Sequence, residues 1–155
     1  MTTTTTTTTT AVVFSVGPDR YAVAAAAVRE AICKARVFAL PTAPPALLGA
    51  FNLRGEVLPV FDTGMLLGVG AIADGSTVMV VNTSAGPAGF AVSDLPRVAI
   101  LTNKLGPSEL RGTLGVFGVD DQVAVLVDVE ELLVPHAALN TSPASEDSDH
   151  RGEHR

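Results

Sequence analysis

The sequence contains few of the residues that enzymes and metal proteins use. It has no tryptophan and a single cysteine, Cys33, so the chain can form neither an intramolecular disulfide nor a cysteine-based zinc site. All three histidines lie beyond residue 135, outside the most apolar part of the chain. With no base expected near it, Cys33 is predicted to be a buried structural thiol. The sequence therefore predicts no catalytic residue and no metal site.

Charge is scarce as well. Asp, Glu, Lys and Arg make up 17% of the chain, the net charge is −6, and no run of basic residues is present. A nucleic-acid-binding protein needs a cationic surface to displace counterions, so this class is excluded. The longest uncharged apolar stretch, residues 78–92, contains Asn82 and Pro87 and is shorter than the ~20 residues of a membrane span. Because no basic residue precedes an apolar N-terminal segment either, we predict a soluble cytoplasmic protein without direct membrane insertion.

The two ends of the chain differ from the rest in composition. Residues 1–10 are one methionine and nine threonines, and residues 140–155 are mainly Ser, Asp, Glu, His and Arg. Neither segment has enough apolar residues to offset the entropy lost on ordering, so we expect both to be disordered. Residues 11–139 hold nearly all the Val, Leu, Ile and Phe, and we expect them to form one domain with a substantial core.

Within this domain the dominant hydrophobic period is two, which is typical of β-strands. Apolar residues alternate on both sides of residues 17–20, and this pattern predicts a β-hairpin. A second tight hairpin is expected around residues 120–121. Further strands are expected over residues 56–61, 77–82, 89–93, 97–101, 114–119 and 122–127.

Helical patterns are short. Residues 24–28 are rich in alanine, and residues 43–49 have prolines near their start and a glycine at their end, so each is expected to form a short helix. Asp128 is a candidate N-cap for a helix over residues 128–133, with Glu131 as its capping-box partner. Many short strands with few helices favour an antiparallel barrel or sandwich. No internal repeat is apparent in the sequence.

Ligand-binding patterns are weak. The glycines of residues 112–118 lack the Lys-Ser/Thr ending of a phosphate loop, and we interpret them as bends in strands. The adjacent carboxylates at residues 120–121 and 130–131 suit a turn and a helix surface, where such groups are solvated. We therefore expect no cofactor.

One segment, residues 47–62, places a single arginine between two apolar runs. By strand periodicity Asn52 and Arg54 share one face, and the apolar residues beside them share the other. Arg54 has two interpretations. Its guanidinium pairs with a neighbouring carboxylate such as Glu30 or Asp62, or it anchors an interface, a role in which arginine is common. The two are compatible, because a paired arginine can still hold a docking surface in shape.

At this segment the sequence resembles the CheW-like domain family, whose members are adaptors in bacterial chemosensory arrays. The resemblance covers nearly all of residues 11–133 as an ordered series of motifs. Its most specific block is Gly49, followed by Asn-Leu-Arg-Gly at residues 52–55 and Leu-Pro-Val-Phe-Asp at residues 58–62. The other matching segments are Phe14–Gly17, Tyr21–Val23, Val28–Glu30, Leu40–Pro44, Leu67–Gly68, Thr77–Val81, Gly89–Asp94 and Val123–Leu133.

The resemblance implies a mainly β fold of two SH3-like five-stranded β-barrels that share a hydrophobic core. It implies no catalysis. Members of the family connect the cytoplasmic tip of a methyl-accepting chemoreceptor to the regulatory domain of the histidine kinase CheA. The receptor's helical hairpin lies in a groove between the barrels, and kinase and adaptor alternate in rings through pseudo-equivalent barrel ends.

The family's motifs place partner-binding residues at four positions, Val28, Glu30, Asn52 and Arg54. Val28 is expected to supply an apolar contact beside the groove. Glu30 is expected to orient Arg54, which bonds to polar groups near the receptor tip or fixes the adjacent strands. Gly49 and Gly55 are expected to support the interface by holding the loop that carries Arg54.

The sequence departs from the family pattern at three places. The family's Asp-Leu-Arg after the Pro-Val strand is Asp-Thr-Gly at residues 62–64, its usual Val-Asp is Val-Ser-Asp at residues 92–94, and the connection over residues 105–111 is short. All three lie on loops at the barrel ends and bear on the choice of partners. Because of the first and the third, an adaptor that binds receptors without recruiting the kinase is an alternative. A small-ligand-binding β-barrel is a further alternative, although the sequence offers no set of convergent polar groups for a ligand site.

Overall fold

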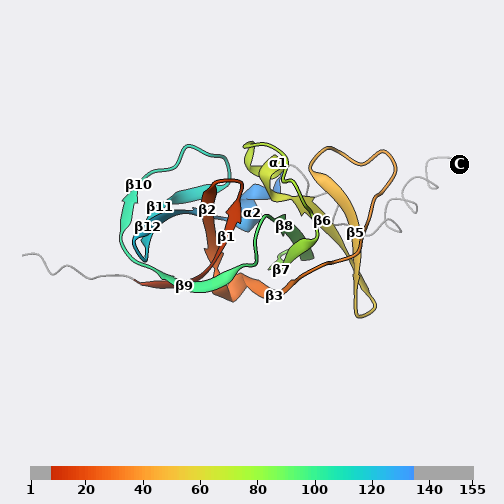
Figure 1. Ribbon diagram of the computed structural model, residues 1–155, viewed down its shortest axis with the longest axis horizontal. Coiled ribbons are helices and arrows are strands. Elements are labelled where there is room, and N and C mark those ends of the chain that lie inside the picture. The colour runs from red at the N-terminus through yellow and green to blue at the C-terminus, as the bar shows by residue number, and fades with distance from the viewer. Residues whose placement is uncertain (1–7, 135–155) are drawn as a thin grey trace, which may run out of the picture.

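The computed structural model describes residues 8–134, most of which form two six-stranded β-sheets (Figure 1). The first sheet contains β1 (Thr9–Val16), β2 (Asp19–Ala24), β9 (Arg97–Leu101), β10 (Lys104–Gly106), β11 (Thr113–Val119) and β12 (Gln122–Val127). The second contains β3 (Val28–Ile32), β4 (Val37–Phe38), β5 (Leu47–Leu53), β6 (Glu56–Asp62), β7 (Thr77–Thr83) and β8 (Gly86–Val92). Three short helical segments complete the fold, η1 (Ala25–Ala27), α1 (Thr63–Leu67) and α2 (Val129–Leu132).

Each sheet curls until its two edges meet along one bent stretch of chain. The first sheet has the order β10-β11-β12-β2-β1-β9, and its edge strands β9 and β10 are consecutive, separated by residues 102–103. The Thr102 backbone N–H also donates to the Gly118 carbonyl (2.9 Å), which joins this bend to β11. The second sheet has the order β3-β7-β8-β6-β5-β4, with β3 and β4 separated by residues 33–36. If β9 and β10 are counted as one bent strand, and β3 and β4 as another, each sheet has the five strands that the family resemblance implies.

The apolar side chains form one core between the sheets and one core within each sheet. Alternate residues of β1 serve different cores: Val12 and Phe14 belong to the shared core, and Ala11 and Val13 to the core of the first sheet. The sequence of β1 is therefore apolar on both faces, as expected for a strand covered on both sides. Figure 1 shows the first sheet on the left and most of the second on the right, with α2 between them.

The two sheets share a repeated unit of hairpin, aspartate and short helix. Residues 47–67 and 113–133 each contain it, and in each the first strand has a bulge near its start, at Gly49 and at Gly115. The repeat was not apparent from the sequence because the halves share only scattered residues, mostly apolar. The identical pairs, at equal spacing, are Leu48/Leu114, Gly49/Gly115, Phe51/Phe117, Val57/Val123, Asp62/Asp128, Leu66/Leu132 and Leu67/Leu133.

Two of the predicted helices differ in the structure. The helix expected over residues 43–49 is wrong: turns occupy residues 41–46, and β5 begins at Leu47. Gly49, Phe51 and Leu53 are the buried side of that strand, and this period of two outweighs the proline-to-glycine helix pattern. The alanine-rich segment forms only the single turn η1. The third predicted helix is confirmed as α2, with Asp128 accepting hydrogen bonds from the backbone N–H groups of Glu130 and Glu131.

Two further expectations are wrong. β1 begins at Thr9, and Thr9 and Thr10 pair with Leu101 and Ile100 of β9, so the ordered domain starts two residues earlier than predicted. Cys33 is exposed, because it lies in the connection between β3 and β4 and not within a core.

Residues 1–7 and 135–155, which include most of the predicted leader and the whole predicted tail, lie outside the described residues. No helix within residues 8–134 is long and apolar enough to cross a membrane.

Candidate functional site

Arg54 lies at the turn between β5 and β6, not within a strand as the periodicity suggested. Arg54 and Gly55 both have positive φ, +51° and +91°, the pattern of a type I′ turn. The Asn52 side-chain oxygen accepts a hydrogen bond from the Gly55 backbone N–H (2.8 Å) and closes the turn. The predicted two faces are confirmed, since Asn52 and Arg54 are exposed while Phe51 and Leu53 are buried.

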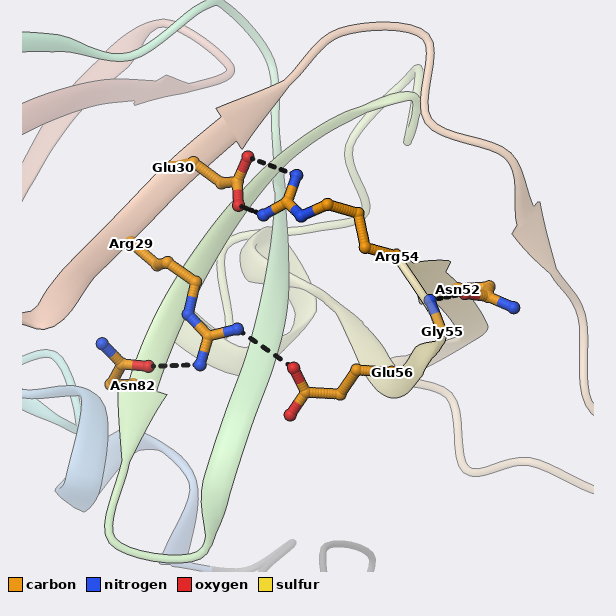
Figure 2. Close-up of polar contacts among 7 residues, drawn as sticks. All are labelled: Arg29, Glu30, Asn52, Arg54, Gly55, Glu56 and Asn82. Atoms are coloured by element: carbon orange, nitrogen blue, oxygen red, sulfur yellow. Dashed lines mark hydrogen bonds and ion pairs between the residues drawn. The ribbon is translucent and has the colours of Figure 1, made fainter.

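The Arg54 guanidinium pairs with Glu30 on β3 (Figure 2). Both terminal nitrogens take part: Nη1 donates to Oε1 (3.4 Å) and Nη2 donates to Oε2. The hydrogen bond from Arg54 holds the pKa of the Glu30 carboxyl below its usual range, and the carboxylate in turn raises the pKa of the guanidinium. Of the two carboxylates considered from the sequence, Glu30 is therefore the partner. Asp62 is buried and instead caps α1 by accepting from the Met65 backbone N–H (3.1 Å).

A bulge in β3 turns two consecutive side chains toward the same hairpin. Val28 is paired with Val81 of β7 and Glu30 with Val80, so Arg29 is an extra residue in the ladder. In a regular strand Arg29 and Glu30 would point to opposite faces, and a bulge removes that alternation. Figure 2 shows both side chains directed from β3 toward the β5–β6 hairpin.

Arg29 makes a second set of polar contacts beside the first. Its Nη1 donates to Glu56 at the start of β6 (3.1 Å) and its Nη2 to the side-chain oxygen of Asn82 on β7 (3.1 Å). Sequence reasoning missed all three residues, because the bulge that aligns Arg29 with Glu30 leaves no periodic signal. The only hint was the order of charges, Arg-Glu at residues 29–30 and Arg-Gly-Glu at residues 54–56.

Two predicted residues lie outside this polar cluster. Val28 is half-buried and packs against the core between the sheets. Gly49 lies at the bulge near the start of β5, where a Cβ atom would stand 2.0 Å from the Phe38 carbonyl oxygen of β4. Gly49 therefore permits the close approach of β4 to β5, whereas Gly55 belongs to the Arg54 turn.

The arrangement suits contact with another protein better than chemistry. The four charged side chains of the cluster are paired with one another, and all lie at the surface. A surface pocket of about 730 Å³ lies elsewhere, between the β1–β2 and β11–β12 turns, and is lined by residues such as Tyr21 and Val123. Within residues 8–134, no three or more His, Cys, Asp or Glu side chains are grouped to hold a metal ion.

Comparisons with known proteins agree with the fold. Residues 10–135 match the model of the CheW-like domain. Among solved structures, the scaffolding protein TtCheW from Thermoanaerobacter tengcongensis is similar, with a TM-score of 0.72 and 22% sequence identity over 84% of this chain and 96% of that one. Comparison with curated proteins gave no match. The family match spans both sheets, so the chain belongs to the CheW-like domain family.

Proposed function

We propose that this protein couples the cytoplasmic tip of a methyl-accepting chemoreceptor to the regulatory domain of the histidine kinase CheA, on the cytoplasmic side of the membrane that holds the receptor. The observation that carries the proposal is the Arg54 turn, which is closed by Asn52 and locked onto β3 through Glu30, two residues from Val28. Three of the four residues that the family's motifs assign to partner binding thus belong to one surface cluster, and the fourth adjoins it.

An exposed apolar strip on β9 supports a docking surface for the receptor. Val98 and Ile100 are 68% and 55% exposed, and they pair with Val12 and Thr10 of β1. Val12 belongs to the core between the sheets, against which Val28 also packs. Val98 and Ile100 therefore extend the face of that core into solvent, at the side of the molecule where Figure 1 shows β9 and β3. Apolar surface of this kind is typical of protein interfaces.

The surroundings of each residue indicate a different role in binding. Val28 and the β9 strip supply apolar contact with the receptor's helices. Arg54, whose side chain is 69% exposed, keeps donor groups available to the receptor while Glu30 sets its direction. Asn52 acts through the turn that it closes.

The repeated unit supports contact with the kinase. The turn between β11 and β12 is the counterpart of the Arg54 turn, and there Asp120 has a φ of +54° and pairs with Arg97 (3.1 Å). The protein therefore presents two similar turns, one from each sheet, as expected if kinase and adaptor meet through pseudo-equivalent ends.

Assembly of purified components tests the proposal. The wild-type protein is expected to form a ternary complex with a soluble receptor signalling-tip fragment and a CheA regulatory domain, measured by size-exclusion chromatography. Arg54→Glu and Val28→Asp are expected to weaken the complex while circular dichroism shows an unchanged fold. Arg111→Glu is the matched control, because Arg111 is exposed and lies just before β11 of the first sheet, whereas the Arg54 turn belongs to the second. Unchanged assembly with both site variants would contradict the assigned surface.

Separate titrations distinguish the receptor-only alternative. This alternative is favoured by the start of α1, where Gly64 stands at the position of the arginine in the family's Asp-Leu-Arg. Binding of the receptor fragment without binding of the kinase domain would select it.

A further inference from the structure

The turn that carries Arg54 is held on both sides of Gly55, and the second contact involves a residue that no family motif assigns. Before Gly55, Arg54 pairs with Glu30; after it, Glu56 pairs with Arg29 (3.1 Å) (Figure 2). We propose that Arg29 is a positioning residue of the receptor-binding surface, which holds the Arg54 turn through Glu56 and fixes the orientation in which the turn meets its partner.

In one ion pair β3 supplies the cation and in the other it supplies the anion, and this makes the contact specific. On β3 a cation precedes an anion, Arg29 then Glu30, and on the turn a cation precedes an anion, Arg54 then Glu56. The pairs join Arg29 to Glu56 and Glu30 to Arg54, so opposite charges meet only in this register. A turn displaced by the reach of one side chain would bring Arg54 toward Arg29 in one direction, or Glu56 toward Glu30 in the other, and either pair of like charges repels. The contact therefore selects one placement of the turn.

Arg29 is the better anchored of the two arginines. Its side chain is 35% exposed, against 69% for Arg54. It also contacts a second strand, because its Nη2 donates to Asn82 on β7 while its Nη1 donates to Glu56. A planar guanidinium with two occupied sides has little rotational freedom left. Arg29 thus links the hairpin to β7, while the more exposed Arg54 stays accessible to a partner.

The first measurement needs no partner and tests the contact itself. Arg29→Met, Glu56→Gln and the double variant are compared by NMR through the Gly55 amide signal, which reports the closed turn, with Arg111→Met as the control. Each single variant is expected to shift this signal, and the double variant to shift it no further than the larger single shift. The pKa of Glu30 is also expected to rise in Arg29→Met, because Arg29 is one of the two cations that lower it. Independent, additive shifts would overturn the positioning role.

The second measurement rests on the proposed function. Binding of a receptor signalling-tip fragment is expected to weaken about three- to tenfold in Arg29→Met and in Glu56→Gln, and in the double variant by no more than the larger single loss. A double variant that loses the product of the two single effects, or single variants that bind like Arg111→Met, would overturn the inference. If the wild type does not bind the fragment, the proposed function fails, whereas the NMR measurement still decides whether Arg29 holds the turn.

Discussion

Replacement of Gly49 by alanine tests whether the second sheet depends on the close approach of β4 to β5. An alanine Cβ at this position would lie 2.0 Å from the Phe38 carbonyl oxygen, 2.7 Å from the Phe38 carbonyl carbon and 3.1 Å from the Ala39 Cα. All three are backbone atoms, and non-bonded heavy atoms prefer a separation of about 3.5 Å. The chain of β4 must therefore withdraw by more than about 1 Å, at the strand that closes the sheet.

Gly115 provides a matched control, because it occupies the same place in the repeated unit. Gly49 has a φ of +156° and Gly115 a φ of +142°, so alanine meets similar backbone strain at both. At Gly115, however, the nearest atom to an added Cβ is Cε of Lys104, at 2.6 Å, the far end of a flexible side chain that can move aside. The nearest backbone atom at Gly115 is the Gly106 carbonyl oxygen at 3.1 Å, against 2.0 Å for the Phe38 oxygen at Gly49, so the difference between the two variants measures the cost of the closer backbone contact.

Overpacking that displaces backbone costs about 1–3 kcal/mol, in addition to the strain that both variants share. Urea unfolding followed by circular dichroism is expected to show Gly49→Ala less stable than Gly115→Ala by that amount. Lys104→Ala combined with Gly115→Ala is expected to recover part of the loss at Gly115, since it removes the side chain in the way. Equal destabilisation by the two glycine replacements would refute the reasoning, because it would mean that β4 yields as readily as a lysine side chain.

Two further outcomes follow from other contacts. Because Arg54 lowers the folded-state pKa of Glu30, this carboxyl stabilises the fold at pH values above its unfolded pKa, and the contribution is lost as the pH falls through the folded pKa. Carbon-detected NMR titration is expected to show the Glu30 pKa rising toward its ordinary value in Arg54→Met; an unchanged pKa would contradict the pairing. Leu132 is fully buried between the sheets, so Leu132→Ala is expected to cost about 2–5 kcal/mol in urea unfolding, while Val134→Ala, at a 58% exposed position, changes stability by less than about 0.5 kcal/mol. Similar losses at both positions would contradict the assignment of the shared core.

Local patterns predicted most of the long elements of this fold, but not β3 or the start of β5. The hairpin around residues 17–20, the hairpin at residues 120–121 and the Asp128 cap are all present, because each depends on residues that are neighbours in sequence. The short strands β4 and β10 were missed, since two or three residues carry no measurable period. They form where the bent chain meets the rest of its sheet, and this depends on tertiary closure.

The candidate site was predictable only in part, for a similar reason. The exposed face of Asn52 and Arg54 follows from strand alternation, and the turn follows from the glycine at residue 55. The partner of Arg54 did not follow, because two carboxylates were available and only the path of β3 places Glu30 nearer. Arg29 was missed because the bulge breaks the alternation on which the reasoning depended.

The repeated unit gives the two sheets equivalent hairpins whose turns carry opposite charge. In the second sheet the turn residue with positive φ is Arg54 and the bent strand supplies the carboxylate of Glu30; in the first the turn residue is Asp120 and the bent strand supplies Arg97. A partner that recognised only the shape of the hairpin would fit both sheets. A partner with a charged group facing the turn is attracted at one turn and repelled at the other. The reversal of a single ion pair therefore makes the two ends of a nearly symmetric scaffold distinguishable to the proteins that bind it.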